Sequence, residues 1–137
     1  MTLVLDNALM IDWLVSEGPI DRIENVMRGH AGSFITASLF WAELPYVLGK
    51  RLHRQEIDVN FRNTSLKLVQ ALGIVTDFEA GRPGFAFDRM MALSERYGLT
   101  VYDAVYLELA IRCGGLLGTT DKKLGVAARK AGVKVVP

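Results

Sequence analysis

The hydrophobic pattern along the chain has two alternating signatures. Runs of three or four apolar residues, bounded by polar or turn-forming residues, are typical of buried strands, whereas apolar positions that recur every three and four residues are typical of helices. The pattern predicts strands over residues 3–5, 33–36, 74–76, 116–119 and 133–136. It predicts helices over residues 8–15, 20–28, 38–53, 57–72, 85–97, 101–112 and 121–130.

This alternation of short apolar strands with helices predicts an α/β fold with a central parallel sheet of about five strands surrounded by helices. The chain contains no internal repeat, linker or change of composition, so we expect one domain over residues 1–137. Three residues or pairs interrupt the helical pattern. Gly18-Pro19 is expected to close the first helix and Gly98 to cap a later one. Pro45 lies inside the pattern of residues 38–53, where its missing N–H predicts a kink or a break.

Composition narrows the class of protein. Of the 137 residues 50% are hydrophobic and 23% are charged, which excludes a disordered segment. A net charge of +1 excludes a protein that grips nucleic acid mainly by bulk positive charge. The single Cys113 excludes an internal disulfide framework and a cysteine-rich zinc site. Asp6 interrupts the apolar start that a signal peptide would need, and no segment has the length of a membrane span, so we expect a cytoplasmic protein with no membrane partner.

Two acidic residues directly follow predicted strands. Asp6 comes after residues 3–5, and Asp121 comes after residues 116–119. Ligands of parallel α/β sheets bind at the carboxyl ends of the strands, so both acids are candidate functional residues. The alternative for each is a structural one, because Asp is also favoured at the start of a helix.

Two further acids lie on apolar stripes of predicted helices. Glu43 has apolar or aromatic residues three and four positions away on both sides, Tyr46 among them, which places it on a buried stripe. A buried carboxylate is costly without a partner, and the structural alternative is an ion pair with an arginine. Asp103 shows the same pattern, and its alternative is a loose capping box that begins at Thr100.

Glu108 serves as a control for this reasoning. It stands four residues before Arg112, the spacing of an exposed ion pair on a helix, so we expect an exposed pair and assign it no function.

Four carboxylates gathered at one site would repel one another and would take up protons unless a cation were present. Oxygen ligands of this kind suit Mg²⁺ or Mn²⁺. His30 and His53 lack the spacing of a zinc site, and the chain has neither a glycine-rich phosphate loop nor a nucleophile elbow. If Asp6, Glu43, Asp103 and Asp121 lie together in the fold, we therefore expect a magnesium or manganese ion among them.

The chain resembles a known family over nearly its full length. It is similar to PIN domains, in particular to the small VapC-type ribonuclease toxins of prokaryotic type II toxin–antitoxin systems. Four segments carry the resemblance, and the two C-terminal ones are specific as a pair. They are Leu3-Val4-Leu5-Asp6, Trp41-Ala42-Glu43, Gly98-Leu99-Thr100-Val101-Tyr102-Asp103-Ala104 and Gly118-Thr119-Thr120-Asp121-Lys122-Lys123-Leu124.

The resemblance implies a PIN fold and a metal-dependent endoribonuclease, a hydrolase of RNA phosphodiester bonds. It carries the family's acidic cluster onto Asp6, Glu43, Asp103 and Asp121, as catalytic residues and metal ligands, and places Thr119 as a supporting residue. It further implies an RNA substrate, a cognate antitoxin protein as partner, and a homodimer.

Other functions remain open at this stage. A PIN-type nuclease could serve RNA processing without a toxin role, and a silent domain could only bind RNA or protein, although the complete set of four acids argues against lost catalysis. A phosphohydrolase with an aspartyl nucleophile would need a second Asp two residues after the first, where this chain has Ala8.

Positive charge is unevenly distributed. Residues 112–134 contain six Lys or Arg and one acid, and residues 50–67 contain five Lys or Arg and two acids. These stretches could guide an RNA backbone towards an acidic centre. The alternative is that they are solubilising helix ends that complement the helix dipole.

Overall fold

The computed structural model describes residues 1–16 and 21–137. Its centre is a five-stranded sheet with the order β3-β2-β1-β4-β5, in which every pair of neighbouring strands is parallel. The strands are β1 (Leu3–Leu5), β2 (Phe34–Ala37), β3 (Val75–Asp77), β4 (Leu116–Gly118) and β5 (Val135–Val136). The predicted α/β class with a central parallel sheet is confirmed, and each predicted strand is found within two residues of its expected bounds.

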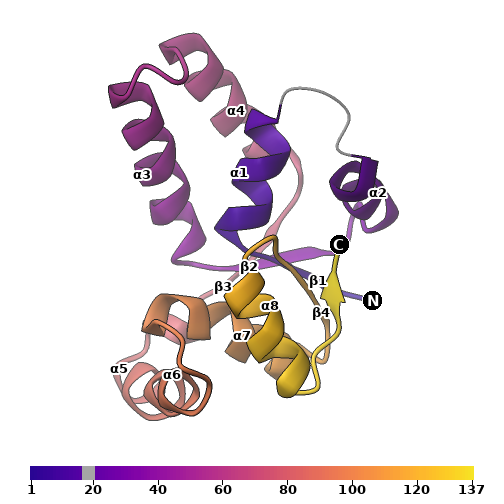
Figure 1. Cartoon of the computed structure of the whole chain (residues 1–137), viewed down its shortest axis with the longest axis vertical. Helices are drawn as coiled ribbons and strands as arrows, with labels where there is room; N and C mark the ends of the chain where they lie inside the picture. Colours follow the sequence, from indigo (N-terminus) through magenta and orange to yellow (C-terminus); the bar gives the residue numbers. More distant parts are fainter. Residues whose placement is uncertain (17–20) are drawn as a thin grey trace.

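Helices cover both sides of this sheet. The α-helices of seven or more residues are α1 (Asn7–Val15), α2 (Asp21–Gly29), α3 (Phe40–His53), α4 (Val59–Ala71), α6 (Met91–Tyr97), α7 (Val101–Cys113) and α8 (Lys122–Lys130). Helix α7 packs against β1, β2 and β4, while α1 and α3 lie beside each other on the opposite side (Figure 1). The predicted end of the first helix at Gly18-Pro19 lies outside the described residues.

One helical segment is irregular. A 3₁₀ turn (Glu79–Gly81) and a short helix α5 (Pro83–Phe85) lead into a π-helical stretch (Ala86–Met90), which continues directly as α6. The segment ends at Gly98, whose φ of 65° is the left-handed conformation that glycine adopts most readily. The prediction of a helix over residues 85–97 with a Gly98 cap is confirmed, but its π-helical part was not predicted.

Helix α3 runs through Pro45, so the expected break at this residue is wrong. A proline inside a helix costs about 3 kcal/mol, because it removes one hydrogen bond and crowds the preceding turn. Phe40, Leu44 and Leu48 of the same helix are at most 1% exposed. Burial of such side chains contributes about 1.5–3 kcal/mol each, which together outweighs the cost of the proline.

The sheet and helix α1 pack tightly at the end of β4. A side-chain β-carbon at Gly118 would lie 2.9 Å from Leu9 Cδ2 and 3.2 Å from Leu3 Cδ1. Glycine at this position therefore allows α1 to approach β4 closely. The backbone N–H of Asp6 donates to the carbonyl of Gly118, which fixes the start of α1 against the end of β4.

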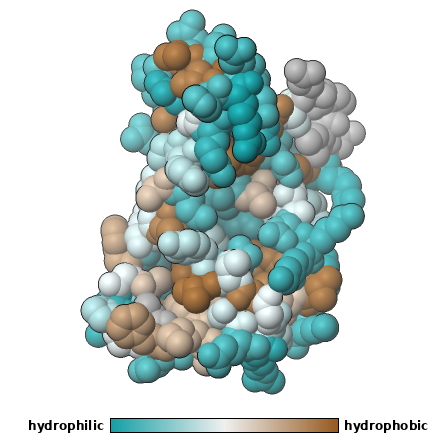
Figure 2. Space-filling model, turned by 60° about the vertical axis from the view of Figure 1, so that its left-hand side comes forward, coloured by the Kyte–Doolittle hydropathy of each residue, from teal (hydrophilic) through white to brown (hydrophobic). Residues whose placement is uncertain are grey.

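Surface polarity is uneven (Figure 2). Mostly hydrophilic residues cover the upper end of the molecule, where α3 passes into α4, and hydrophobic patches lie over the lower half. Tyr46 is 66% exposed, so its predicted place on a buried stripe is wrong. Among the described residues, no helix combines the length and apolar character that crossing a membrane requires.

Candidate metal and catalytic site

Asp6 is the most buried carboxylate of the predicted site, with 4% of its surface exposed. It caps helix α1, because its Oδ1 accepts a hydrogen bond from the Leu9 N–H at 2.8 Å. Its Oδ2 accepts a second hydrogen bond from the hydroxyl of Thr119. The structural role proposed as the alternative is therefore present, but it does not explain why this carboxylate is buried beside other acids.

The pKa of Asp6 is raised to about 7. Burial is the main cause, and the negative charges of Asp121 and Asp103 add to it, while the hydrogen bonds from Leu9 and Thr119 act in the opposite direction. Within residues 1–16 and 21–137, Asp6 has no salt-bridge partner. A bound cation would relieve this electrostatic cost.

Thr119 connects two of the acids. It directly follows β4, whose Gly118 pairs with Leu5 of β1, so Thr119 and Asp6 leave the sheet side by side. Its hydroxyl donates to Asp6 and accepts from the Asp121 N–H at 3.0 Å. By these two bonds the Thr119 side chain fixes Asp6 and the start of α8 relative to each other, which fits the supporting role expected of it.

Asp121 caps helix α8. Its Oδ1 accepts hydrogen bonds from the Lys123 N–H at 2.9 Å and the Leu124 N–H at 3.2 Å. Both capping bonds fall on Oδ1. Because its charge acts on Asp6 and on Asp103, Asp121 is close to both.

Asp103 lies in the first turn of α7, and the predicted cap is present: Thr100 Oγ1 accepts a hydrogen bond from the Asp103 N–H at 3.1 Å. This bond uses the main-chain N–H of Asp103. Burial raises the pKa of that carboxylate, and Asp121 raises it further, while Lys123 and the hydrogen bond to Thr100 have the opposite effect. The cap therefore accounts for the helix start but not for the position of the charge.

Glu43 reaches the site from α3, and its partners are neutral. Its Oε1 accepts hydrogen bonds from the hydroxyl of Tyr106 at 2.6 Å and from Asn7 Nδ2 at 3.1 Å. The ion pair with an arginine, which was the structural alternative, is not formed within the described residues. Burial and the bond to Glu43 raise the pKa of Tyr106, so this phenol keeps its proton and remains a donor.

Asn7 and Tyr106 were not predicted as members of this site. Asn7 follows Asp6, and Tyr106 lies one helical turn after Asp103 on α7, so each stands beside an acid. Asn7 Nδ2 also donates to the Tyr106 oxygen at 3.0 Å. Glu43, Asn7 and Tyr106 are thus hydrogen-bonded to one another, and two of the three stand beside an acid of the site. The only hint in the sequence was that these two residues lie near Asp6 and Asp103. By its pattern alone, Tyr106 belongs to the apolar stripe of its helix.

The oxygen-rich chemistry of the cluster fits a magnesium or manganese ion. Asn7 Oδ1 is buried and has no hydrogen-bond partner among the described residues, which is unusual for a buried amide oxygen. In the same part of the chain, no three His, Cys, Asp or Glu side chains are arranged to hold a metal by themselves. Mg²⁺ is commonly bound by one or two carboxylates, with waters and substrate phosphates completing its shell, so the cluster suits that mode of binding and not an all-protein cage.

Glu108, the control residue, differs from its prediction. The pair with Arg112 is present at 2.8 Å, but Glu108 is only 2% exposed, so the predicted exposure is wrong. Arg112 also binds both carboxylate oxygens of Asp77, at 2.9 and 2.7 Å. This network connects α7 to β3. It also occupies Arg112, one of the basic residues that could have guided RNA.

Comparison with known proteins gives structural matches but no sequence matches. No protein-family model matches the chain, and neither does any curated protein. The fold is similar to PAE2754 from Pyrobaculum aerophilum, with a TM-score of 0.73 and 20% identity over 99% of this chain and 84% of the other.

Two further solved structures match over nearly their whole length. A toxin–antitoxin complex from Klebsiella pneumoniae has a TM-score of 0.68 and 18% identity, over 99% of this chain and 97% of the other. FitAcB from Neisseria gonorrhoeae has a TM-score of 0.67 and 15% identity, with the same coverage. At this level of identity the likeness establishes a shared fold.

Proposed function

We propose that the chain is a divalent-metal-dependent endoribonuclease and the toxin of a type II toxin–antitoxin pair. One observation carries the enzymatic part: Asp6, Asp103 and Asp121 lie close enough for their charges to act on one another, and the pKa values of Asp6 and Asp103 are raised. Glu43 is hydrogen-bonded to Asn7 and Tyr106, which stand beside two of these acids in the chain, and none of the four carboxylates has a salt-bridge partner among the described residues. Such an arrangement is costly for folding alone and is typical of a site that binds a cation.

Asp6, Glu43, Asp103 and Asp121 would hold the ion, as the resemblance to PIN domains also implies. A bound ion would lower the pKa of a water molecule and would stabilise negative charge on the reacting phosphate. Thr119 keeps Asp6 in place by its hydrogen bond, and Tyr106 and Asn7 orient Glu43. The reaction is hydrolysis, in which water attacks the phosphorus of an RNA phosphodiester and leaves a 5′-phosphate on the downstream product.

The toxin role and an antitoxin partner rest on the resemblance and on the fold shared with the toxin–antitoxin complex from Klebsiella pneumoniae. A nuclease of RNA processing would have the same chemical site. Growth of bacteria after induced expression separates the two: the toxin role requires growth arrest that an inactive variant does not cause. A homodimer remains a prediction that the structure of one chain does not test.

Cleavage of defined RNAs tests the enzymatic part, with Asp103→Asn as the inactive variant. This substitution keeps the size of the side chain and leaves the Thr100 cap intact, because the cap uses the main-chain N–H. We expect wild type to cleave with Mg²⁺ or Mn²⁺ and not with EDTA, and Asp103→Asn to lose most of the activity. Substituted carboxylates that act as one unit have large, non-additive effects on rate.

The matched control is Asp58→Asn, which alters an exposed acid that caps α4 in the same way that Asp6 caps α1. Its cleavage rate should equal that of wild type. Equal cleavage by wild type and Asp103→Asn would remove Asp103 from the site, and cleavage that persists in EDTA would contradict the metal-dependent mechanism.

A further inference from the structure

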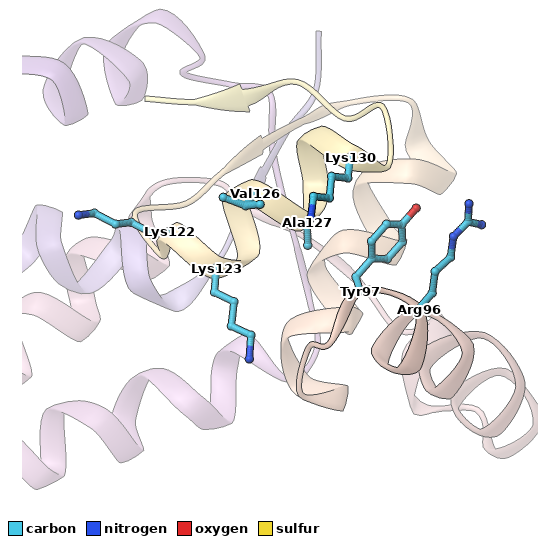
Figure 3. Close-up of a pocket in the computed structure, with 7 residues that line it drawn as sticks. All are labelled: Arg96, Tyr97, Lys122, Lys123, Val126, Ala127 and Lys130. Carbon is cyan, nitrogen blue, oxygen red and sulfur yellow. The ribbon is translucent and has the colours of Figure 1, made fainter.

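A groove of about 560 Å³ lies between helices α6 and α8, and its charged lining is entirely positive (Figure 3). Arg96 and Tyr97 line it from α6, and Lys122, Lys123 and Lys130 line it from α8. Within the described part of the chain, none of these four cations forms a salt bridge, whereas five arginines elsewhere do. The groove therefore offers positive charge that the protein itself does not neutralise.

The groove leads to the acid cluster. Lys122 also lines a neighbouring pocket, together with Thr119 and Asp121 of the site and with Arg22 and Arg129. Lys123 of the groove lies near Asp103 of the cluster. A chain of negative groups lying in the groove would thus continue directly to the carboxylates.

We propose that this groove binds the backbone of single-stranded RNA and guides it to the acid cluster. The proposal rests on the proposed function, because it names where the substrate of that site lies. Cations without an acidic partner in the protein are suited to bind the phosphates of a strand. Tyr97 adds one aromatic ring, and the Arg96 guanidinium lies over it, 5.4 Å from the ring centre. An unpaired base can stack on an aromatic ring or a guanidinium, and a paired base of a duplex cannot.

Arg112 does not contribute to this surface. Its guanidinium is held by Glu108 and Asp77, so the stretch of residues 112–134 divides into a structural arginine, four cations of α8 and Lys134 beyond that helix. Substitution of groove residues alone therefore tests the proposal more specifically than removal of positive charge from the whole stretch.

The test measures binding of a labelled single-stranded RNA of about 12 nucleotides, a length within the range of single-strand sites, by fluorescence anisotropy in EDTA. The variant is Arg96→Ala/Lys130→Ala, because both residues belong to the groove and neither is part of the acid cluster. The control is Lys67→Ala/Lys134→Ala, which removes two exposed lysines outside the groove. Both variants have the same net charge.

Loss of two phosphate contacts should lower the slope of log affinity against log salt by about 1.4, and at 0.1 M monovalent salt it should weaken binding roughly 20-fold. The control should bind as wild type does, and a duplex of the same sequence should compete poorly. Equal binding by the groove variant and wild type, or no binding by wild type, would overturn the proposal. Equally strong competition by an acidic peptide would assign the groove to a protein partner instead.

The outcome is separable from that of the proposed function. A protein that binds RNA through the groove in EDTA but never cleaves it with metal would refute the nuclease and leave the groove standing. If wild type cleaves RNA but the groove variant binds RNA as tightly as wild type, the nuclease would stand and the groove would be refuted.

Discussion

Asp6→Asn should abolish metal-dependent cleavage and, in the absence of metal, make the protein more stable at pH 8. The wild-type carboxyl has a pKa of about 7 in the folded protein and of 3.8 in the unfolded chain. Folding therefore favours the protonated form, and wild-type stability falls as pH rises from about 4 to about 7, because the unfolded chain binds fewer protons in this interval. Above pH 7 the loss is complete and the curve levels off.

A shift of this size corresponds to about 4 kcal/mol, at 1.4 kcal/mol for each pKa unit. Asparagine removes the charge and still caps a helix well, and its amide can donate to the Thr119 hydroxyl. The variant should thus lack this pH dependence, and its advantage over wild type should grow between pH 4 and 7. The free energy of unfolding, measured with urea in EDTA at several pH values, checks this expectation.

Asp58→Asn is again the matched control. Asp58 caps α4 through the Phe61 N–H at 2.7 Å with a backbone conformation close to that of Asp6, but it is exposed. Its variant should follow the wild-type pH curve. If Asp6→Asn instead ran parallel to wild type across the whole range, the buried charge would not be a cost to folding, and the argument for a missing cation would fail.

Arg112→Ala should cause the largest loss of stability among the substitutions considered. Arg112 pairs with Glu108, which is 2% exposed, and removing the arginine leaves that carboxylate with Arg89, at 3.8 Å, as its cation. Breaking a buried ion pair from one side costs about 3–5 kcal/mol when the remaining charge has no other partner, and the more distant, half-exposed Arg89 places the expected loss at the lower end, about 3 kcal/mol. The link from α7 to Asp77 of β3 is lost in the same step.

The control for this prediction is Arg82→Ala. Arg82 pairs with Glu79 at 2.7 Å, which is as short as the bonds of Arg112, but both side chains are exposed. An exposed pair contributes about 0–1 kcal/mol, so the control should unfold close to wild type. Similar losses for the two variants would show that burial of Glu108 is not what makes its network important. Denaturant unfolding at neutral pH distinguishes these outcomes.

The sequence was sufficient for the strands because each is a short run with apolar residues bounded by polar or turn-forming ones. The central strands β1 and β4 are fully buried, whereas the edge strands β3 and β5 are only partly buried. The break expected at Pro45 is absent because the buried side chains of α3 outweigh the local effect of the proline. The exposure expected of Glu108 is wrong for a related reason. All seven residues from Ala104 to Ala110 are buried, so α7 has no polar face in this stretch that spacing alone could identify.

In the candidate site, too, some residues could be placed from the sequence and others could not. Asp6, Asp121 and Thr119 follow strands that pair with their neighbours, so topology brings them together, and their positions could be predicted. The contacts of Glu43 with Asn7 and Tyr106 join residues 36 and 63 positions apart in the chain. Contacts of this kind depend on how α3 and α7 pack across the sheet, which no local pattern encodes.

The central claim is that the acids at the carboxyl edge of the sheet form one cation site. Its most direct test is the thermal unfolding midpoint of wild type, Asp103→Asn and Asp58→Asn as Mn²⁺ is added. A ligand that binds only the folded state stabilises it by about 2.7 kcal/mol at 100 times its Kd. We predict a rising midpoint for wild type and Asp58→Asn and a flat one for Asp103→Asn. An equal rise in all three, or a rise in none, would contradict the claim.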